Sequence, residues 1–140
     1  MSKDFEQINF EPFMKHNGGL LFRTISENES EFKTTIKENH LNAAGITHGG
    51  FISAIVDTGL SAVAYKASGN SSCATISLEI KFIAAVKLGE ELFGKAKIQK
   101  RTKSMIFLTC ELTAANQIVA TGSSLLKILN KKIAKTGTDV

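Results

Sequence analysis

The sequence contains few of the residues that mark disulfide-rich and metal-binding proteins. Its two cysteines, Cys73 and Cys110, lie far apart and form no CxxC pair. We therefore expect both to be reduced packing residues of a cytoplasmic protein. The three histidines, His16, His40 and His48, lack the spacing of metal ligands, so no metal site is expected.

Long apolar runs are also missing. No run approaches the roughly 18–20 residues of a membrane span, and the first residues, MSKDFEQINF, lack the apolar stretch of a secretory signal. The net charge of +4 is compatible with an anionic small molecule, RNA or a membrane surface and selects none of them. A length of 140 residues is typical of one domain, which we expect to span residues 1–140 with a polar tail from about 130.

The apolar pattern predicts a sheet and one long buried helix. The N-terminal part is expected to form a short helix over 5–15, interrupted at Pro12, and two strands over 20–26 and 32–37. A loop over 41–50 precedes an alanine-rich helix over 51–65, with Gly69 as its terminator. Four further strands are expected over 75–83, 92–99, 105–113 and 118–129, joined as one antiparallel meander. In the first of these, Ile76, Leu78, Ile80 and Phe82 alternate with polar residues, which predicts a regular, half-buried strand.

Only the 51–65 helix is long and apolar enough to cover the meander. The predicted fold is therefore α+β, with an antiparallel sheet wrapped around one central helix. Almost all of this helix is apolar, yet Ser53, Asp57 and Ser61 follow one another at intervals of four residues and form a narrow polar stripe. A buried, ionised carboxylate costs several kcal/mol unless partners or water satisfy it. Asp57 is thus either a structural group with a buried partner, or a catalytic base or nucleophile in a cleft.

The residues before the helix raise a second question. His48, Gly49 and Gly50 stand where the helix begins, and the first N–H groups of a helix have no partner within it. Glycine allows a ligand to approach the backbone closely, so a carbonyl directed at Gly49 would find an oxyanion hole. The structural alternative is a tight turn into the helix, with His48 as an ordinary loop residue.

Within one chain, Asp57 and the N–H of Gly49 lie too far apart to act on the same carbonyl. Asp57 lies eight residues after Gly49, which is about 12 Å along a helix. Asp57 therefore cannot direct water at a carbonyl held at the start of its own helix. A twofold dimer with antiparallel helices side by side would bring each Asp57 to the Gly49 of the other copy. We expect a homodimer at least.

The stretch NAAGITHGGFISAIVDTG, from Asn42 to Gly59, resembles the signature of hotdog-fold acyl-CoA thioesterases of the phenylacetate-degradation type. The family pattern is Asn, two residues, Gly, two residues, His-Gly-Gly and then an Asp in the helix. The resemblance continues through ATISLEIKFIAAVKLGEEL and covers roughly residues 30–130. A proline and a hairpin glycine that are common in the family are absent from FIAAV and KRTKSM.

The resemblance implies a role for each matching residue. Asp57 would be the general base or nucleophile, and the Gly49 N–H would polarise the thioester carbonyl. Asn42 would support that carbonyl or the leaving group, His48 would border the pocket, and Thr75 would help place the attacking water. The family also implies a dimer, commonly assembled into a homotetramer.

Coenzyme A is strongly anionic, and the segment QKRTKSM carries basic residues and hydroxyls in one hairpin. The resemblance places the nucleotide near this turn and near Phe82. The expected contacts are Phe82, Lys100, Arg101, Thr102, Lys103 and Ser104. The alternative is a solvated basic hairpin.

The function expected from these residues is hydrolysis of an acyl-CoA thioester to a free acid and CoA. One base-directed water and one oxyanion hole are sufficient for this reaction, so no cofactor is expected beyond the CoA of the substrate. The alternatives are a hotdog protein that binds acyl-CoA without cleaving it, and a hydratase or dehydratase on the same fold. The expected partner is a small acyl-CoA molecule, with no nucleic acid and no membrane. The sequence does not indicate the length or type of the acyl chain.

Overall fold

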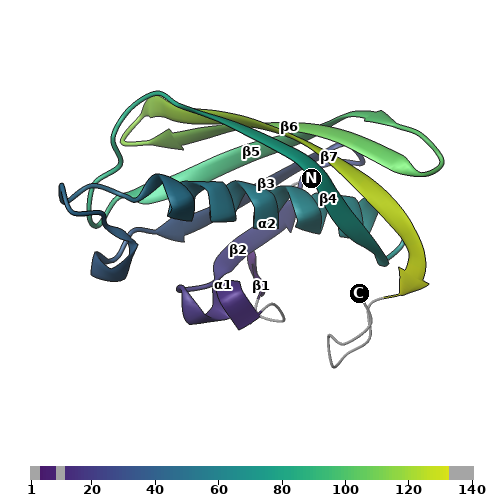
Figure 1. The fold of residues 1–140 in the computed structure, drawn as a ribbon, viewed down its shortest axis with the longest axis horizontal. Helices are drawn as coiled ribbons and strands as arrows, with labels where there is room; N and C mark the ends of the chain where they lie inside the picture. Colours follow the sequence, from purple (N-terminus) through teal and green to yellow (C-terminus); the bar gives the residue numbers. More distant parts are fainter. Residues whose placement is uncertain (1–3, 9–11, 133–140) are drawn as a thin grey trace.

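The computed structural model describes residues 4–8 and 12–132. Its two helices are α1 (Pro12–His16) and α2 (Gly49–Ala67), and a 3₁₀ turn, η1 (Glu38–His40), precedes α2. The strands are β1 (Glu6–Ile8), β2 (Leu20–Thr24), β3 (Glu29–Thr35), β4 (Ser71–Phe82), β5 (Glu91–Arg101), β6 (Met105–Ala114) and β7 (Gln117–Lys132). The strands form one sheet that curls around α2, so the expected hotdog architecture is confirmed (Figure 1).

The order of the strands differs from the expected meander. The sheet runs β1-β2-β3-β5-β6-β7-β4, with all neighbours antiparallel. Strands β5, β6 and β7 do follow one another, but β4 pairs with β7 at the far edge and β5 pairs with β3. The reason is that α2 carries the chain across the concave face of the sheet, so β4 begins on the opposite side from β3 (Figure 1). The expected pairing of β4 with β5 was wrong.

Two local predictions near the N-terminus also need correction. Residues 6–8 form strand β1, paired with β2 through Gln7 and Leu21, where a helix from residue 5 was expected. The helix in this region begins at Pro12, a position that proline suits because its missing N–H would have had no partner there. Residues 9–11 of the predicted helix, and residues 133–140 of the predicted tail, lie outside the described residues.

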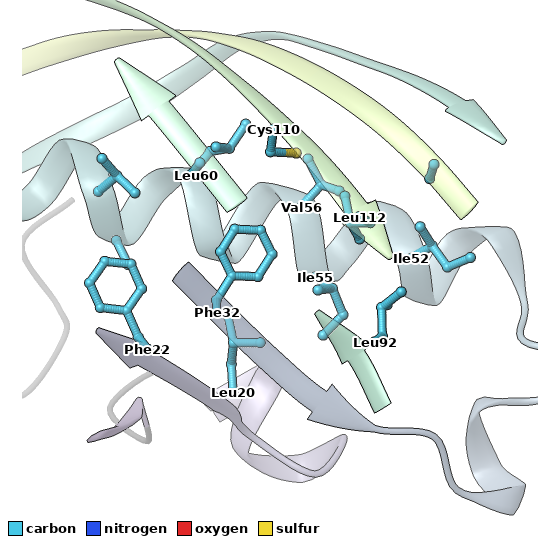
Figure 2. Packing of buried hydrophobic residues seen from close by; sticks show 14 of the residues in the cluster. Leu20, Phe22, Phe32, Ile52, Ile55, Val56, Leu60, Leu92, Cys110 and Leu112 are labelled. Carbon is cyan, nitrogen blue, oxygen red and sulfur yellow. The ribbon is translucent and has the colours of Figure 1, made fainter. Parts of the chain in front are cut away.

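The core lies between α2 and the concave face of the sheet. Apolar side chains of the strands pack against apolar side chains of the helix (Figure 2). The strands contribute Leu20, Phe22, Phe32, Leu92 and Leu112, and the helix contributes Ile52, Ile55, Val56 and Leu60. Each such side chain contributes about 1.5–3 kcal/mol by burial. The ring of Phe32 lies between helix and sheet, because a Cβ on Gly59 of α2 or on Gly94 of β5 would come within 2.6 Å of it. These two glycines let helix and sheet approach each other across the Phe32 ring.

One side of α2 is only partly covered by the described residues. Ten of its residues are buried, whereas Ser53, Ala54, Asp57, Ser61 and Tyr65 are only half-buried. They lie on the side next to β4, which has no strand at its outer edge among the described strands. No helix in the described part of the chain is long and apolar enough to cross a bilayer.

Strand β4 contains an irregularity that its sequence does not indicate. Its pairing with β7 shifts register between Thr75 and Ser77, leaving Ile76 as an extra residue. Ile76 is 54% exposed, so it does not belong to the inward-facing set with Leu78 and Ile80. The predicted regular alternation is therefore wrong at this point. A bulge is compatible with an apolar–polar pattern because it changes which residue faces inward without changing the sequence of residue types.

Candidate active site

The start of α2 presents one backbone N–H that is free to bind a ligand. His48 is the N-cap, and its Nδ1 accepts a hydrogen bond of 2.8 Å from the N–H of Gly50. The N–H groups of Phe51 and Ile52 reach the carbonyl oxygen of His48 at 3.0 and 3.2 Å. The N–H of Gly49 has no acceptor within the described residues. A donor at the positive end of a helix, left open in this way, is suited to a developing negative charge.

The loop before Gly49 is held rigidly by its own hydrogen bonds. The side-chain oxygen of Asn42 accepts N–H groups from Ala44 at 2.9 Å and from Ile46 at 3.3 Å. Both the N–H and the hydroxyl of buried Thr47 donate to the carbonyl of Val86, at 2.9 and 2.8 Å. The Asn42 oxygen is thus used to shape the loop, which the sequence did not indicate. Its amide nitrogen makes no hydrogen bond within the described part of the chain.

The Phe82 side chain lies beside Gly49 at the start of α2. The last residue of β4 places the tip of its ring 3.3 Å from the position of a Cβ on Gly49. The ring is 57% exposed, so it lies beside the helix start at the surface of the chain. His48, Gly49 and Phe82 therefore form one group, which we call the helix-start group, and Asn42 lies in the loop that leads to it.

Asp57 and Thr75 form the second group. The hydroxyl of Thr75 donates to Oδ1 of Asp57 at 2.8 Å, joining β4 to the half-buried stripe of α2. Oδ2 of Asp57 has no hydrogen-bond donor within the described residues. Thr75 thus fixes one oxygen of the carboxylate and leaves the other available to a water molecule.

The basic hairpin lies at the other end of α2. The Arg101 guanidinium donates to the carbonyl oxygen of Ala67, the last residue of the helix. The Thr102 hydroxyl accepts the N–H of Met105 at 3.0 Å and so closes the turn. Lys100, Lys103 and Ser104 are exposed. Because α2 has 19 residues, the hairpin lies roughly 27 Å from the start of the same helix.

The structure therefore brings together some predicted residues and separates others. The helix-start group is compact, and Thr75 reaches Asp57. About 12 Å of helix still separates Gly49 from Asp57 within one chain, and the hairpin is farther away. Helix α2 carries contacts of all three parts, but it holds them apart within the described residues of one chain.

The structure also places the cysteine thiols and the side chains that could bind a metal. Burial raises the pKa of the Cys110 thiol to about 12. Burial also raises the pKa of Cys73, although its hydrogen bond with Ser68 and the charge of Arg101 oppose the rise. Neither thiol is therefore suited to be a nucleophile at neutral pH. Within residues 4–8 and 12–132, no three His, Cys, Asp or Glu side chains gather closely enough to hold a metal ion.

A curled antiparallel sheet around one long helix is the architecture of hotdog-fold proteins. The sequence model of the thioesterase superfamily matches residues 44–121, which is more than half of the chain. The chain belongs to the thioesterase superfamily. The matched residues include Gly49, Asp57, Thr75 and Phe82.

Individual relatives are distant. A Pseudomonas aeruginosa protein named as a possible esterase is 25% identical over 118 residues, covering 84% of this chain and 88% of its own. The human acyl-coenzyme A thioesterase 13 is 27% identical over 89 residues, covering 62% of this chain and 64% of its own, so the match spans less than two thirds of that relative. The structure of the Escherichia coli PaaI protein from the phenylacetic acid degradation operon superposes with a TM-score of 0.80 at 17% identity, covering 89% of this chain and 88% of that one. This last likeness concerns the fold alone.

Proposed function

We propose that this chain is an acyl-CoA thioesterase, which hydrolyses the thioester bond of an acyl-CoA to give a carboxylic acid and CoA. The observation that carries the proposal is the unpartnered N–H of Gly49 at the start of the helix that also bears Asp57. The thioesterase superfamily and the human relative support this class of substrate. The acyl chain stays open.

In the proposed reaction, the thioester carbonyl oxygen accepts the Gly49 N–H. Oδ2 of Asp57 takes a proton from a water molecule as the water oxygen attacks the carbonyl carbon, while Thr75 holds Oδ1. The negative charge that develops on the carbonyl oxygen faces the positive end of α2. The tetrahedral intermediate then collapses, the carbon–sulfur bond breaks and the CoA thiolate leaves, taking up the proton that Asp57 had accepted. In a variant of this mechanism, the Asp57 carboxylate attacks the carbonyl carbon and the carbon–sulfur bond breaks, and water then hydrolyses the resulting acyl–Asp57 anhydride to the free acid.

The proposed site is shared between two copies of the chain. Strand β4 is a twelve-residue edge strand with exposed apolar side chains, Ile76 and Phe82, and such an edge is a template for pairing. Antiparallel pairing of two β4 edges about a twofold axis would also cover the half-buried side of α2. Asp57 and Thr75 would then face Gly49 of the partner subunit. The homotetramer is a further step, in which two such dimers associate.

The same arrangement gives the basic hairpin a place in the site. When two α2 helices lie antiparallel, the end of one is beside the start of the other. Lys100, Arg101 and Lys103, together with the hydroxyls of Thr102 and Ser104, would approach the CoA phosphates bound at the partner's helix-start group. Asp57 and the hairpin would thus come from one chain and the oxyanion hole from the other.

The test is hydrolysis of a panel of medium-chain, long-chain and aryl acyl-CoAs by the wild type and by Asp57→Asn. Asparagine is nearly isosteric but can neither take a proton nor attack. We expect the variant to fold and to bind CoA, with kcat lower by about 10²–10⁴.

The melting temperature of the same samples separates catalysis from stability. A structural role for Asp57 predicts a lower melting temperature with normal turnover per folded molecule, and that result would overturn the catalytic assignment. A wild type that binds acyl-CoA but hydrolyses no member of the panel would indicate the non-catalytic binding protein instead.

A further inference from the structure

His40 is a buried histidine with a fully defined hydrogen-bond environment. Its side chain lies in η1, is 2% exposed and faces the turn after α1. Nδ1 accepts the N–H of Lys37 at 2.9 Å, and Nε2 lies 2.7 Å from the carbonyl oxygen of Asn17. A backbone N–H only donates, so Nδ1 is the acceptor and the ring proton is on Nε2, where it donates to Asn17. Both polar atoms of the neutral ring are thereby satisfied.

The same residue holds the start of α2 from two directions. Its carbonyl oxygen accepts the N–H of His48, the N-cap, at 2.8 Å. Its ring stacks on Phe51 in the first turn of the helix, with centroids 3.7 Å apart and an angle of 9° between the planes. Gly49 stands between these two contacted residues. The position of its N–H is therefore fixed on both sides by His40.

The anchoring of His40 lies outside the active-site loop. Asn17 follows α1, where its own N–H groups bond to the carbonyls of Phe13 and Met14, and Met14 is fully buried. A Cβ at Gly18 would come within 3.5 Å of the His40 ring, so the turn packs directly against it. The His40 ring thus connects α1, which is anchored by the buried Met14, to the oxyanion donor.

We propose that His40 is a positioning residue for the oxyanion hole, which sets the direction of the Gly49 N–H without touching the substrate. This proposal rests on the proposed thioesterase function. It predicts that disturbing His40 weakens stabilisation of the transition state more than binding of CoA, because the proposed phosphate contacts come from the hairpin. Misplacement of a reacting group by about 1 Å can cost about 10² in rate.

The experiment compares His40→Phe with His16→Phe. Phenylalanine at 40 keeps an aromatic ring for Phe51 but loses the bonds to Lys37 and Asn17. His16 is exposed at the end of α1 and serves as the matched control. We expect kcat per folded molecule to fall about 10- to 100-fold in His40→Phe, with KM changed by less than about twofold, and both constants to be unchanged in His16→Phe. An unchanged kcat per folded molecule in His40→Phe would overturn the proposal.

A second variant serves if His40→Phe does not fold. His40→Gln keeps a planar group with an N–H near the position of Nε2, and it loses the acceptor for Lys37. We expect a smaller fall in kcat, about 5- to 20-fold, again at constant KM. A normal kcat for folded His40→Gln would overturn the proposal, because the imidazole would then be replaceable.

A direct signal separates this proposal from the proposed function. Gly49 is the only glycine that follows a histidine in the sequence, so labelling with ¹³C-carbonyl histidine and ¹⁵N-glycine isolates its amide resonance. We expect this resonance to shift or broaden in His40→Phe and not in His16→Phe. If the wild type hydrolyses no acyl-CoA, the proposed function fails, and the resonance alone decides whether His40 positions Gly49. An identical Gly49 resonance in wild type and His40→Phe would contradict it.

Discussion

The two ends of α2 differ in how their backbone groups are satisfied. At the C-terminal end, the carbonyl of Tyr65 accepts the N–H of Asn70 at 2.8 Å, and that of Ala64 accepts the N–H of Ser68 at 3.0 Å. The carbonyl of Ala67 receives the Arg101 guanidinium. At the N-terminal end, the N–H of Gly49 has no acceptor within the described residues, although a histidine cap stands next to it.

This difference indicates what each end of the helix does. Helix ends are normally satisfied by caps, turns or solvent, and the C-terminal end follows that rule with two residues in the left-handed region, Gly69 and Asn70. At the other end, His48 caps Gly50, and the N–H of Gly49, the residue beside Phe82, has no acceptor in the described part of the chain. A cap that satisfies its neighbour and leaves this donor open is expected of a ligand site. The predictions below test this contrast.

The largest expected effect is that of Gly49→Pro. Proline suits the first position of a helix, and the ψ of 133° at His48 is compatible with a following proline. The substitution therefore removes the N–H of residue 49 while leaving the helix bonds in place. We expect kcat to fall by about 10²–10³, the usual effect of losing one oxyanion donor, in a steady-state assay with acyl-CoA.

Gly49→Ala is the matched control for this variant. It adds the same Cβ, which meets the Phe82 ring at 3.3 Å, but keeps the N–H. Its kcat should stay well above that of Gly49→Pro. Equal losses in the two variants would show that contact with Phe82, and not the missing donor, limits the rate.

Co-expression of two inactive chains tests whether the two ends of α2 serve one site. Chains with Asp57→Asn and chains with Gly49→Pro are each nearly inactive alone. In random dimers, half of the molecules contain both chains, and one of their two sites combines an intact Asp57 with an intact Gly49. About a quarter of wild-type activity is expected in the mixture. Activity no greater than that of the separate variants would place the whole site within one chain.

The smallest expected effect is at the C-terminal end of α2, where the backbone carbonyls have hydrogen-bond donors. Arg101→Ala removes a donor to Ala67 at an exposed position, so stability should fall by no more than about 1 kcal/mol in thermal unfolding. KM for acyl-CoA should rise about fivefold, equivalent to about 1 kcal/mol of lost phosphate contact. A pantetheine thioester, which lacks the phosphates of the nucleotide, should respond little. Lys97→Ala, in the same strand but on the outer face, is the control and should change neither constant.

Much of the fold could be predicted from local patterns, and the errors occur where long-range pairing decides. The central helix and the three strands after residue 90 follow directly from apolar periodicity. The place of β4 at the far edge does not, because periodicity describes which face of a strand is buried and not which strand lies beside it. Strand β1 was missed because three residues are too short to display a period, and its pairing with β2 outweighs local preference.

The candidate residues of the proposed site could be selected from the sequence in part. Asp57 and Gly49 stood out because a carboxylate in an apolar helix and a glycine pair before it both need an explanation. The use of the Asn42 oxygen within its own loop depends on the path of residues 42–46, which no spacing rule gives. His40 was considered only as a candidate metal ligand, because a histidine in a polar segment such as KENH shows no sign of burial. Its contacts with Asn17 and Phe51 come from parts of the chain far apart in sequence.

The extra residue in β4 also explains how two side chains of this strand contact two residues of α2. Thr75 and Phe82 are seven positions apart, an odd number, and in an uninterrupted strand they would point to opposite sides. Both nevertheless turn toward the helix, Thr75 to Asp57 and Phe82 to Gly49. Ile76 acts as a spacer that changes the parity between them. A relative with one residue more or fewer between these positions would need its extra residue at another place in the strand. The two contacts therefore constrain whether the number of residues between Thr75 and Phe82 is odd or even, and not which residues these are.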